Sequence, residues 1–453
     1  MGARLETTRE LCRAGLDLAL GPFRVTAYAA RRRALTAAVA RDLDAPAAVE
    51  DPGELDAAAR ERLLARPLRV FVSCAEPSGE IHALGLVAAL RAELDALGAP
   101  PPELFGLGGT RLAAAGVDCI GDPVQRAAMG ADVLRALPFY LGLVTATARA
   151  LVERAPDVVV PVDSPALHVP LGRIARRAGR PVVHFVTPQY WAWAPWRVGG
   201  YRAAVDRALT ILPFEPAWFA RHAVPTAHVG HPLLDALAEV PASRPEVEAT
   251  PGRAPRLALL PGSRESVVRR NLPWMLTTLS RLRERIPELE VVLAHDRKEL
   301  VEDLRASVAE AGAADWVHLA DGGLHDALTR CDAAFSVSGT ILLDLLHHRL
   351  PTVVVYRLKR RWMAALQDRA LTVPYFASTN LLAGEELCPE FAFAGDGPVE
   401  SIVAALERLL TDPAHRAATL AGLDRVAERL GPPGATRRAA RHALGLAAAG
   451  IRP

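Results

Sequence analysis

The stretch Ala333–His348, which reads AAFSVSGTILLDLLHH, carries the clearest fold signal in the chain. Its first five residues form an apolar run of strand length, Ser338-Gly339-Thr340 follows as a turn of small residues, and Ile341–His348 has the composition of a helix. Short continuous apolar strands that alternate with helices are typical of a parallel sheet covered on both faces. The stretch therefore predicts one strand–turn–helix unit of a doubly wound α/β domain.

The same alternation occurs in two separate parts of the chain. It begins at Leu68, stops in a proline-rich and charged stretch between about Val240 and Arg256, and then restarts. Helices are expected at Ile81–Leu97 and Asn271–Ile286. The strand-like runs are Leu68–Cys74, Leu104–Leu107, Val158–Val162, Val182–Val186, Leu257–Leu260, Glu290–Ala294, Ala333–Val337 and Thr352–Val355.

These patterns predict an α/β protein with two Rossmann-like, doubly wound parallel-sheet domains that face a cleft. Residues 1–66, which are rich in helix-forming residues and lack a catalytic motif, are expected to form a helical N-terminal extension, either as a plain accessory segment or as a membrane or partner contact. The predicted sheet domains are 67–240 and 253–430, and a C-terminal helix is expected at 431–453.

The composition argues against several classes of protein. Hydrophobic residues make up 51% and charged residues 23% of the chain, and the net charge of +2 lacks the basic excess of a dedicated nucleic-acid binder. No apolar run approaches the roughly 18 residues that span a bilayer. The five cysteines are scattered without CxxC spacing, so neither a metal site nor a disulfide framework is expected. The N-terminus lacks the apolar core of a secretory signal, and we expect a cytoplasmic protein without a cofactor.

The second domain contains two candidate anion-binding loops. At Ser338-Gly339-Thr340, the N–H groups and the dipole of the following helix would suit a diphosphate, and Asp344, one turn later, could accept hydrogen bonds from a ribose. At Gly262-Ser263-Arg264, the guanidinium fork matches phosphate oxygens. The structural alternatives are an ordinary N-capped helix and an arginine that pairs with Glu265. Two such loops in one domain favour nucleotide binding.

The first domain offers a candidate general base. Asp163 directly follows the apolar run Val158–Val162, so its carboxylate is expected at the carboxyl edge of the sheet. The alternative is a turn or N-cap aspartate before Pro165. The aromatic segment around Trp191 and Trp193 could line a site for acyl chains or a sugar, or could pack between subdomains.

Taken in order, the motifs resemble the lipid-A-disaccharide synthase family, whose members are glycosyltransferases of the two-Rossmann-domain (GT-B) class. The resemblance covers roughly residues 68–430 and leaves the first 66 residues outside. The matching blocks are Ala75-Glu76-Pro77-Ser78-Gly79-Glu80, Gly106-Leu107-Gly108-Gly109, Pro156-Asp157, Val162-Asp163-Ser164-Pro165, His184-Phe185-Val186-Thr187-Pro188, Trp191-Ala192-Trp193, Leu212-Pro213-Phe214-Glu215, Val229-Gly230-His231-Pro232, Leu260-Pro261-Gly262-Ser263-Arg264, Ser338-Gly339-Thr340 and Asn380-Leu381-Leu382-Ala383-Gly384.

The resemblance implies an inverting, metal-independent transfer in lipid A biosynthesis. UDP-2,3-diacylglucosamine would donate its sugar to the 6-hydroxyl of 2,3-diacylglucosamine 1-phosphate, with Asp163 as the general base. The donor-binding residues implied are Gly262, Ser263, Arg264, Ser338, Gly339, Thr340, Asp344 and Asn380. The implied acceptor-site or loop residues are Ser78, Gly79, Glu80, Gly108, Gly109, His168 and Trp191.

Acylated substrates imply contact with a membrane. The segment Met129–Leu143 matches the family's apolar membrane-contacting region, and its length suits surface insertion rather than spanning. Without the resemblance, a buried core helix is an equally good reading. We expect a peripheral protein on the cytoplasmic face of the inner membrane, as a monomer or a homodimer. The membrane-contacting residues implied are Met129, Val133, Leu134, Leu137, Phe139 and Tyr140.

The chain departs from the family pattern at several positions. The family's Asp-x-Pro-Asp-Phe-Asn is Asp163-Ser164-Pro165-Ala166-Leu167-His168 here, so a carboxylate is lost at Ala166 and an amide becomes an imidazole at His168. The arginine expected after Ala-Gly is Glu385. Lipid-A-disaccharide synthase is the leading hypothesis. These departures are the features that favour the second hypothesis, a related GT-B enzyme that uses another UDP-sugar or lipid acceptor or acts as a UDP-sugar epimerase. A non-catalytic paralogue that binds lipid or nucleotide is the third hypothesis.

Overall fold

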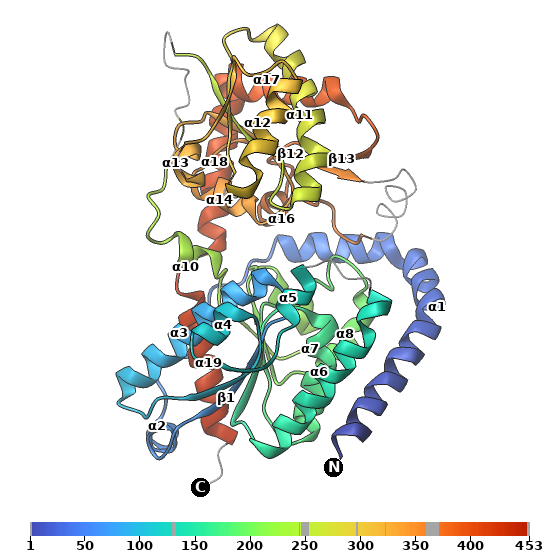
Figure 1. The fold of residues 1–453 in the computed structure, drawn as a ribbon, viewed down its shortest axis with the longest axis vertical. Helices are drawn as coiled ribbons and strands as arrows, with labels where there is room; N and C mark the ends of the chain where they lie inside the picture. Colours follow the sequence, from blue (N-terminus) through green and yellow to red (C-terminus); the bar gives the residue numbers. More distant parts are fainter. Residues whose placement is uncertain are drawn as a thin grey trace. The chain divides into compact units, whose positions relative to one another are not determined.

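The computed structural model describes residues 2–128, 133–243, 245, 253–295, 298–321, 323–358 and 371–450. The chain divides into two compact units (Figure 1). The first comprises Met1–Asp235 together with Gly431–Pro453, and the second comprises Ala236–Leu430. Each unit contains a parallel sheet whose strands are connected by helices, as the continuous apolar runs predict.

In the described part of the first unit, the core is built on seven parallel strands. Four pair in the order β3-β2-β1-β4 and three in the order β5-β6-β7, and the single bridges Val159–Val182 and Val162–Phe185 connect the two sets. The order reverses between β1 and β4, which makes the gap between their carboxyl ends a topological switch point. The strands are β1 (Arg69–Ser73), β2 (Glu103–Leu107), β3 (Asp118–Gly121), β4 (Val158–Pro161), β5 (Val183–Phe185), β6 (Arg207–Thr210) and β7 (Thr226–His228).

The C-terminal helix α19 (Ala435–Gly450) belongs to this first unit and packs against α3 (Pro77–Leu97) (Figure 1). The packing is close because α19 presents alanines, and a Cβ added at Gly85 of α3 would lie 3.0 Å from Thr436. Asp235 caps α19 by accepting hydrogen bonds from the N–H groups of Gly434, Ala435 and Thr436. Besides the helices of the N-terminal extension, the unit contains α4 (Thr110–Ala114), α5 (Pro123–Ala128), α6 (Val133–Glu153), α7 (Pro165–Arg177), η1 (Pro195–Arg197), α8 (Val198–Arg202) and α9 (Glu215–Arg221). The short helix α10 (Leu233–Leu237) includes the division between the units after Asp235.

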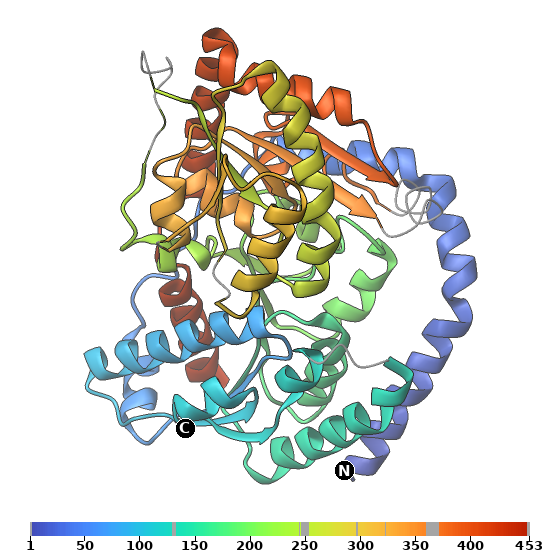
Figure 2. The ribbon, with the colours of Figure 1, turned by 45° about the horizontal axis from the view of Figure 1, so that its top comes forward.

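The N-terminal extension contains the long helix α1 (Ala3–Leu43) and the short helix α2 (Ala57–Leu64). The beginning of α1 packs along α6 (Figure 2), and the buried carboxylates Glu6 and Glu10 pair with Arg173 and Arg177 of α7. Polar pairing therefore attaches the first turns of α1 to the sheet domain, while the stretch that follows, from residue 11 to 20, is exposed.

The described part of the second unit contains a six-stranded parallel sheet in the order β10-β9-β8-β11-β12-β13. This is the 3-2-1-4-5-6 order of a classic dinucleotide-binding sheet, with its switch point between β8 and β11. The strands are β8 (Arg256–Leu260), β9 (Glu290–Leu293), β10 (Val317–Leu319), β11 (Ala333–Val337), β12 (Thr352–Leu358) and β13 (Glu390–Ala394). The helices are α11 (Glu265–Arg285), η2 (Lys298–Leu300), α12 (Val301–Glu310), α13 (Leu324–Leu328), α14 (Ile341–His347), α16 (Ser378–Ala383), α17 (Val399–Thr411) and α18 (Pro413–Leu430).

Every strand-like run expected from the sequence is a strand in the structure. The run Ala333–Val337 coincides with β11, and the other runs differ from their strands by one to three residues at one end or both. The helix expected at Asn271–Ile286 begins earlier, at Glu265, directly after Arg264 in extended conformation, and its added first turns bury Val268 in the core. The described helices include none that is long and apolar enough to cross a membrane.

Candidate active site

Asp163 lies at the switch point of the first unit. It follows β4, and its N–H donates to the carbonyl of Phe185 at 2.9 Å, which ties it to the end of β5. The start of α3 lies against it, since a Cβ added at Gly79 would be 3.8 Å from the Asp163 Cβ. The predicted base is therefore at the carboxyl edge of the sheet, where α/β proteins bind ligands.

The backbone at this position is strained. Asp163 and Ser164 have φ angles of 56° and 46°, in the left-handed region that non-glycine residues seldom occupy. Two buried imidazoles compensate for the strain by hydrogen-bonding to the Asp163 carbonyl oxygen, His168 through Nδ1 at 2.5 Å and His184 through Nε2 at 2.9 Å. Strain of this kind is characteristic of functional sites.

Both histidines are neutral at physiological pH. Burial lowers the pKa of His168 to about 3 and that of His184 to about 4. Each neutral ring donates to the Asp163 carbonyl, so its other nitrogen accepts a hydrogen bond: from the Ser73 hydroxyl in His168 and from the Tyr201 hydroxyl in His184. Both ring nitrogens of His168 thus have hydrogen-bond partners within the protein, and the side chain supports the turn of Asp163 rather than facing a ligand.

Burial raises the pKa of the Asp163 carboxyl, and the nearby Glu76 carboxylate adds to the rise, while a hydrogen bond from the Ser164 N–H opposes it. A carboxylate with a raised pKa is a stronger base than an exposed aspartate. The position and the electrostatics of Asp163 both suit proton abstraction from a hydroxyl.

Among the loop residues predicted near this site, Glu80 and Gly109 form a structural contact. The buried Glu80 carboxylate accepts a hydrogen bond from the Leu112 N–H at 3.1 Å, and a Cβ at Gly109 would lie 2.6 Å from its Oε1. A side chain at 109 would displace the Glu80 carboxylate, and one at 108 would displace Leu112, whose Cδ2 would lie 2.4 Å from the added Cβ. Ser78, at the start of α3, is exposed.

Trp191 is buried and does not line an exposed wall. Its indole N–H donates to Glu215 at 3.1 Å and its ring packs edge-on against Phe214. Burial raises the pKa of Glu215 to about 7, although the N–H groups of Ile211 and Leu212 also donate to it. Trp191 is therefore a packing residue of the first unit and not part of a wall for acyl chains or a sugar, whereas Trp193 is half exposed.

The second unit contains a pocket of about 320 Å³ at its own switch point. The two predicted anion loops contribute to its wall, one after β8 and one after β11. Asp344 of α14 also lines it. The structure therefore brings together six of the eight predicted donor-binding residues: Gly262, Ser263, Ser338, Gly339, Thr340 and Asp344.

The glycine at 262 shapes this pocket. Its φ of +121° lies in the region that favours glycine, and a Cβ there would lie 2.6 Å from Val267 of α11. Arg264, directly after the pocket residue Ser263, is exposed at the start of α11. An exposed guanidinium next to the pocket is available to a diphosphate without breaking a core contact.

Asn380 lies outside the pocket wall and is fully buried. Its amide nitrogen donates to the Cys388 carbonyl at 2.7 Å and to Glu390, and its oxygen accepts from the N–H groups of Leu387 and Cys388. In this structure its amide organises the loop between α16 and β13. Donor binding by Asn380 stays a prediction from the resemblance.

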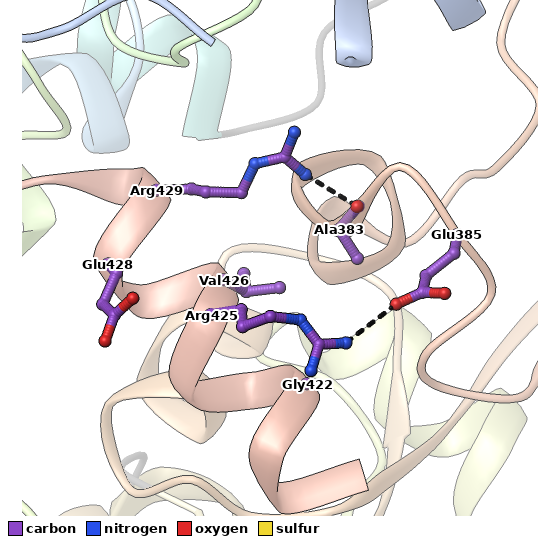
Figure 3. Close-up of a pocket in the computed structure, with 7 residues that line it drawn as sticks. All are labelled: Ala383, Glu385, Gly422, Arg425, Val426, Glu428 and Arg429. Carbon is purple, nitrogen blue, oxygen red and sulfur yellow. Dashed lines mark hydrogen bonds and ion pairs between the residues drawn. The ribbon is translucent and has the colours of Figure 1, made fainter. Parts of the chain in front are cut away.

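Glu385, where the family pattern has arginine, faces another arginine (Figure 3). Arg425 of α18 donates to its carboxylate at 3.1 Å, and Arg429 of the same helix donates to the carbonyl of Ala383 at 2.7 Å. These groups line a separate surface pocket of about 540 Å³. The negative charge of Glu385 is thus partnered within the second unit.

The predicted membrane segment is described in part. Met129 lies outside the described residues, as do the side chains of Val133 and Leu134. In the rest of α6, Leu137 is 47% exposed, and Phe139 packs edge-on against Tyr140. This end of α6 is therefore partly exposed, whereas Leu143 and Val144 of the same helix are buried, and contact with a membrane stays a prediction.

Sequence reasoning missed several polar groups. Ser73 and Tyr201, the partners of the two histidines below Asp163, had no motif to mark them. His295 and His325 line the second-unit pocket and were also missed. A signal was available only for the neighbourhood of His325, in the His347-His348 pair at the end of the expected helix Ile341–His348.

Comparison with known proteins identifies the family of this chain. Residues 70–425 match the family model described as lipid-A-disaccharide synthetase. The chain is 36% identical over 398 residues to the lipid-A-disaccharide synthase of Myxococcus xanthus, covering 84% of this chain and 98% of that one. It is 36% identical over 358 residues to the enzyme of the same name from Chromohalobacter salexigens, covering 78% and 90%.

Solved structures support the fold. A UDP complex of MnaA from S. aureus aligns with a TM-score of 0.52 at 12% identity, covering 82% of this chain and 94% of that one. The UDP-GlcNAc 2-epimerase from Neisseria meningitidis, bound to UDP-GlcNAc, aligns with a TM-score of 0.50 at 11% identity, covering 82% and 97%. At such identities the likeness concerns the two-Rossmann-domain fold alone. The sequence match, which extends over most of the chain, shows that the protein belongs to the lipid-A-disaccharide synthetase family.

Proposed function

We propose that this protein is the glycosyltransferase that transfers 2,3-diacylglucosamine from UDP to the 6-hydroxyl of 2,3-diacylglucosamine 1-phosphate. The observation that carries the proposal is Asp163, a carboxylate with a raised pKa on a strained turn at the switch point of the first sheet. A protein that only binds lipid or nucleotide has no need for such a base.

In the proposed reaction, the acceptor hydroxyl oxygen attacks the anomeric carbon of the donor. A new carbon–oxygen bond forms as the bond to the UDP phosphate oxygen breaks, and UDP leaves with the electron pair. Asp163 takes the hydroxyl proton. Attack from the side opposite to UDP inverts the configuration and gives a β-1,6-linked disaccharide.

The pocket of the second unit is the proposed site for the UDP part of the donor. The backbone N–H groups around Ser338-Gly339-Thr340 and the Arg264 guanidinium would stabilise the charge that develops on the leaving diphosphate. The Asp344 carboxylate, on the same wall, would accept hydrogen bonds from the ribose. These groups supply charge stabilisation from the polypeptide itself.

We also propose peripheral binding to the cytoplasmic face of the inner membrane, because the donor and the acceptor each carry two acyl chains. Exposed Leu137 with Phe139 and Tyr140 on α6 supports a surface contact of this kind. Sedimentation with lipid vesicles, comparing the native chain with Leu137→Asp, measures it. Equal sedimentation of both would contradict a role for this segment.

The decisive test is a transfer assay in detergent with both acylated substrates. We expect the native chain to form disaccharide and UDP, and Asp163→Asn, which keeps the shape but not the base, to lose about 100- to 10,000-fold in kcat. The matched control is Asp95→Asn, at an exposed position near the end of α3. UDP release without disaccharide would indicate another acceptor, and UDP binding without turnover would indicate a non-catalytic paralogue.

A further inference from the structure

A chain of polar side chains in the second unit leads through the buried His348 to the wall of the pocket. It begins at the half-buried Ser243, which contacts His348 (Oγ to Nδ1, 2.8 Å). His348 in turn contacts His325 (Nε2 to Nδ1, 3.1 Å), and His325 Nε2 faces Asp344 Oδ1 at 3.9 Å. His325 and Asp344 line the pocket, whereas His348 is fully buried.

The helices α13 and α14 of the second unit position these groups. Asp344 and His348 are one helical turn apart at the end of α14, where the His348 N–H donates to the Asp344 carbonyl at 3.2 Å. His325 comes from α13, and its ring lies 5.3 Å from that of His348. Two helices with different connections to the sheet thus converge on one carboxylate at the pocket wall.

The protonation of the chain follows from elementary rules. Burial and the neighbouring His347 and His325 lower the pKa of His348 to about 4, so its ring is neutral and has one N–H. An ionised Asp344 only accepts hydrogen bonds, which favours a proton on the His325 nitrogen that faces it. His325 Nδ1 must then accept from His348 Nε2–H, and His348 Nδ1 must accept from the Ser243 hydroxyl.

The distance between His325 and Asp344 at the pocket wall indicates which kind of group could bind between them. A separation of 3.9 Å between His325 Nε2 and Asp344 Oδ1 is too long for a hydrogen bond between them. One hydroxyl oxygen, however, can lie about 2.8 Å from both atoms, donating its proton to the carboxylate and accepting from the imidazole N–H. The pair therefore matches a sugar hydroxyl, which is at once a donor and an acceptor.

We infer that His325 and Asp344 together bind a ribose hydroxyl of the nucleotide, and that His348 is a positioning residue that fixes the orientation and tautomer of His325 for this purpose. The inference rests on the proposed function, because it needs the nucleotide in this pocket. It goes further in naming a second ribose-binding group and the buried histidine that supports it.

The test measures recognition of the hydroxyl separately from overall binding. Calorimetric Kd values are obtained for UDP, 2′-deoxy-UDP, 3′-deoxy-UDP and inorganic diphosphate, with the full chain. We expect one deoxy analogue to bind the native chain about tenfold more weakly than UDP, as for one lost hydrogen bond to a charged group. In His325→Leu and His348→Leu this ratio should fall to about two, while the Kd of diphosphate stays unchanged.

The matched control is His347→Leu, which changes the neighbouring histidine whose Nε2 donates to the Val240 carbonyl instead. It should retain the tenfold ratio. Ser243→Ala should lower the ratio in part, and Ser243→Thr, which keeps the hydroxyl, should restore it. These substitutions at the half-buried Ser243 keep the test informative if a Leu variant fails to fold.

Histidine tautomers provide a second readout that a merely structural role would not move. In 15N-histidine spectra, the native His325 should show its proton on Nε2, and His348→Leu should give a mixture of both tautomers. Native ratios near one for both deoxy analogues, or an unchanged ratio in His348→Leu, would overturn the inference. Absence of any UDP binding would instead overturn the proposed donor site itself.

Discussion

The two candidate sites occupy the same topological position in their sheets but are built in different ways. In the first unit, the backbone of Asp163 is strained and its carbonyl oxygen is held by two buried histidines. In the second unit, the pocket is made of turns and helix starts, with an exposed Arg264 beside it. A base needs a perturbed pKa and hence burial, whereas a leaving diphosphate needs N–H groups and a cation that solvent and ligand can reach.

The largest effect expected from this contrast is on the pH dependence of the unfolding free energy in acid. Neutral, buried His168 and His184 bind protons more readily in the unfolded chain, so the free energy of unfolding should rise with pH from about 4 to 6.5 and be lost on acidification through that window. Each histidine should contribute a slope of about 1.4 kcal/mol per pH unit. Chemical denaturation at several pH values measures it.

In the variant His168→Gln, the slope of the unfolding free energy against pH should be smaller by about 1.4 kcal/mol per pH unit, because the glutamine amide does not titrate. An unchanged slope would mean that His168 is protonated in the folded protein, which would contradict the buried support below Asp163. The same change should also weaken the strained turn and lower the activity of the base.

The pocket of the second unit should instead depend on backbone shape. Gly262→Ala places a Cβ 2.6 Å from Val267 at a φ of +121°, so we expect a loss of about 1–3 kcal/mol in unfolding free energy and a weaker Kd for UDP. Gly339→Ala is the control, since a Cβ there meets nothing within 4 Å. Thermal unfolding and calorimetry measure both, and equal stability of the two variants would refute the steric argument.

The smallest effect is expected at Glu385. Its ion pair with Arg425 is about 61% exposed on both sides, so Glu385→Gln should change the unfolding free energy by less than about 1 kcal/mol. A larger loss would show that this departure from the family pattern has become part of the core of the second unit. Donor affinity, measured in the same variant, shows whether the charge acts on the nucleotide.

Much of the fold was predictable because its signals are local. A run such as Ala333–Val337, followed by small residues and a helical segment, has to be buried on both faces, and this requirement needs no knowledge of the rest of the chain. Short edge strands such as β3 and β10 were missed because their residues are only partly buried and have mixed polarity. The pocket residues after β8 and β11 were found for the same local reason.

The positions of Asp163 and Gly262 at strand ends follow from residue order alone, since the carboxyl ends of parallel strands meet at one edge. The roles of the histidines do not. His168 and His184 are 16 positions apart and meet at one carbonyl, and His325 and His348 meet across two helices, because sheet order and helix packing bring them together. The local sequence therefore predicted the base and the anion loops. The hydrogen-bond partners and the tautomers of the histidines depend on long-range packing in a low-dielectric interior, which only the tertiary structure determines.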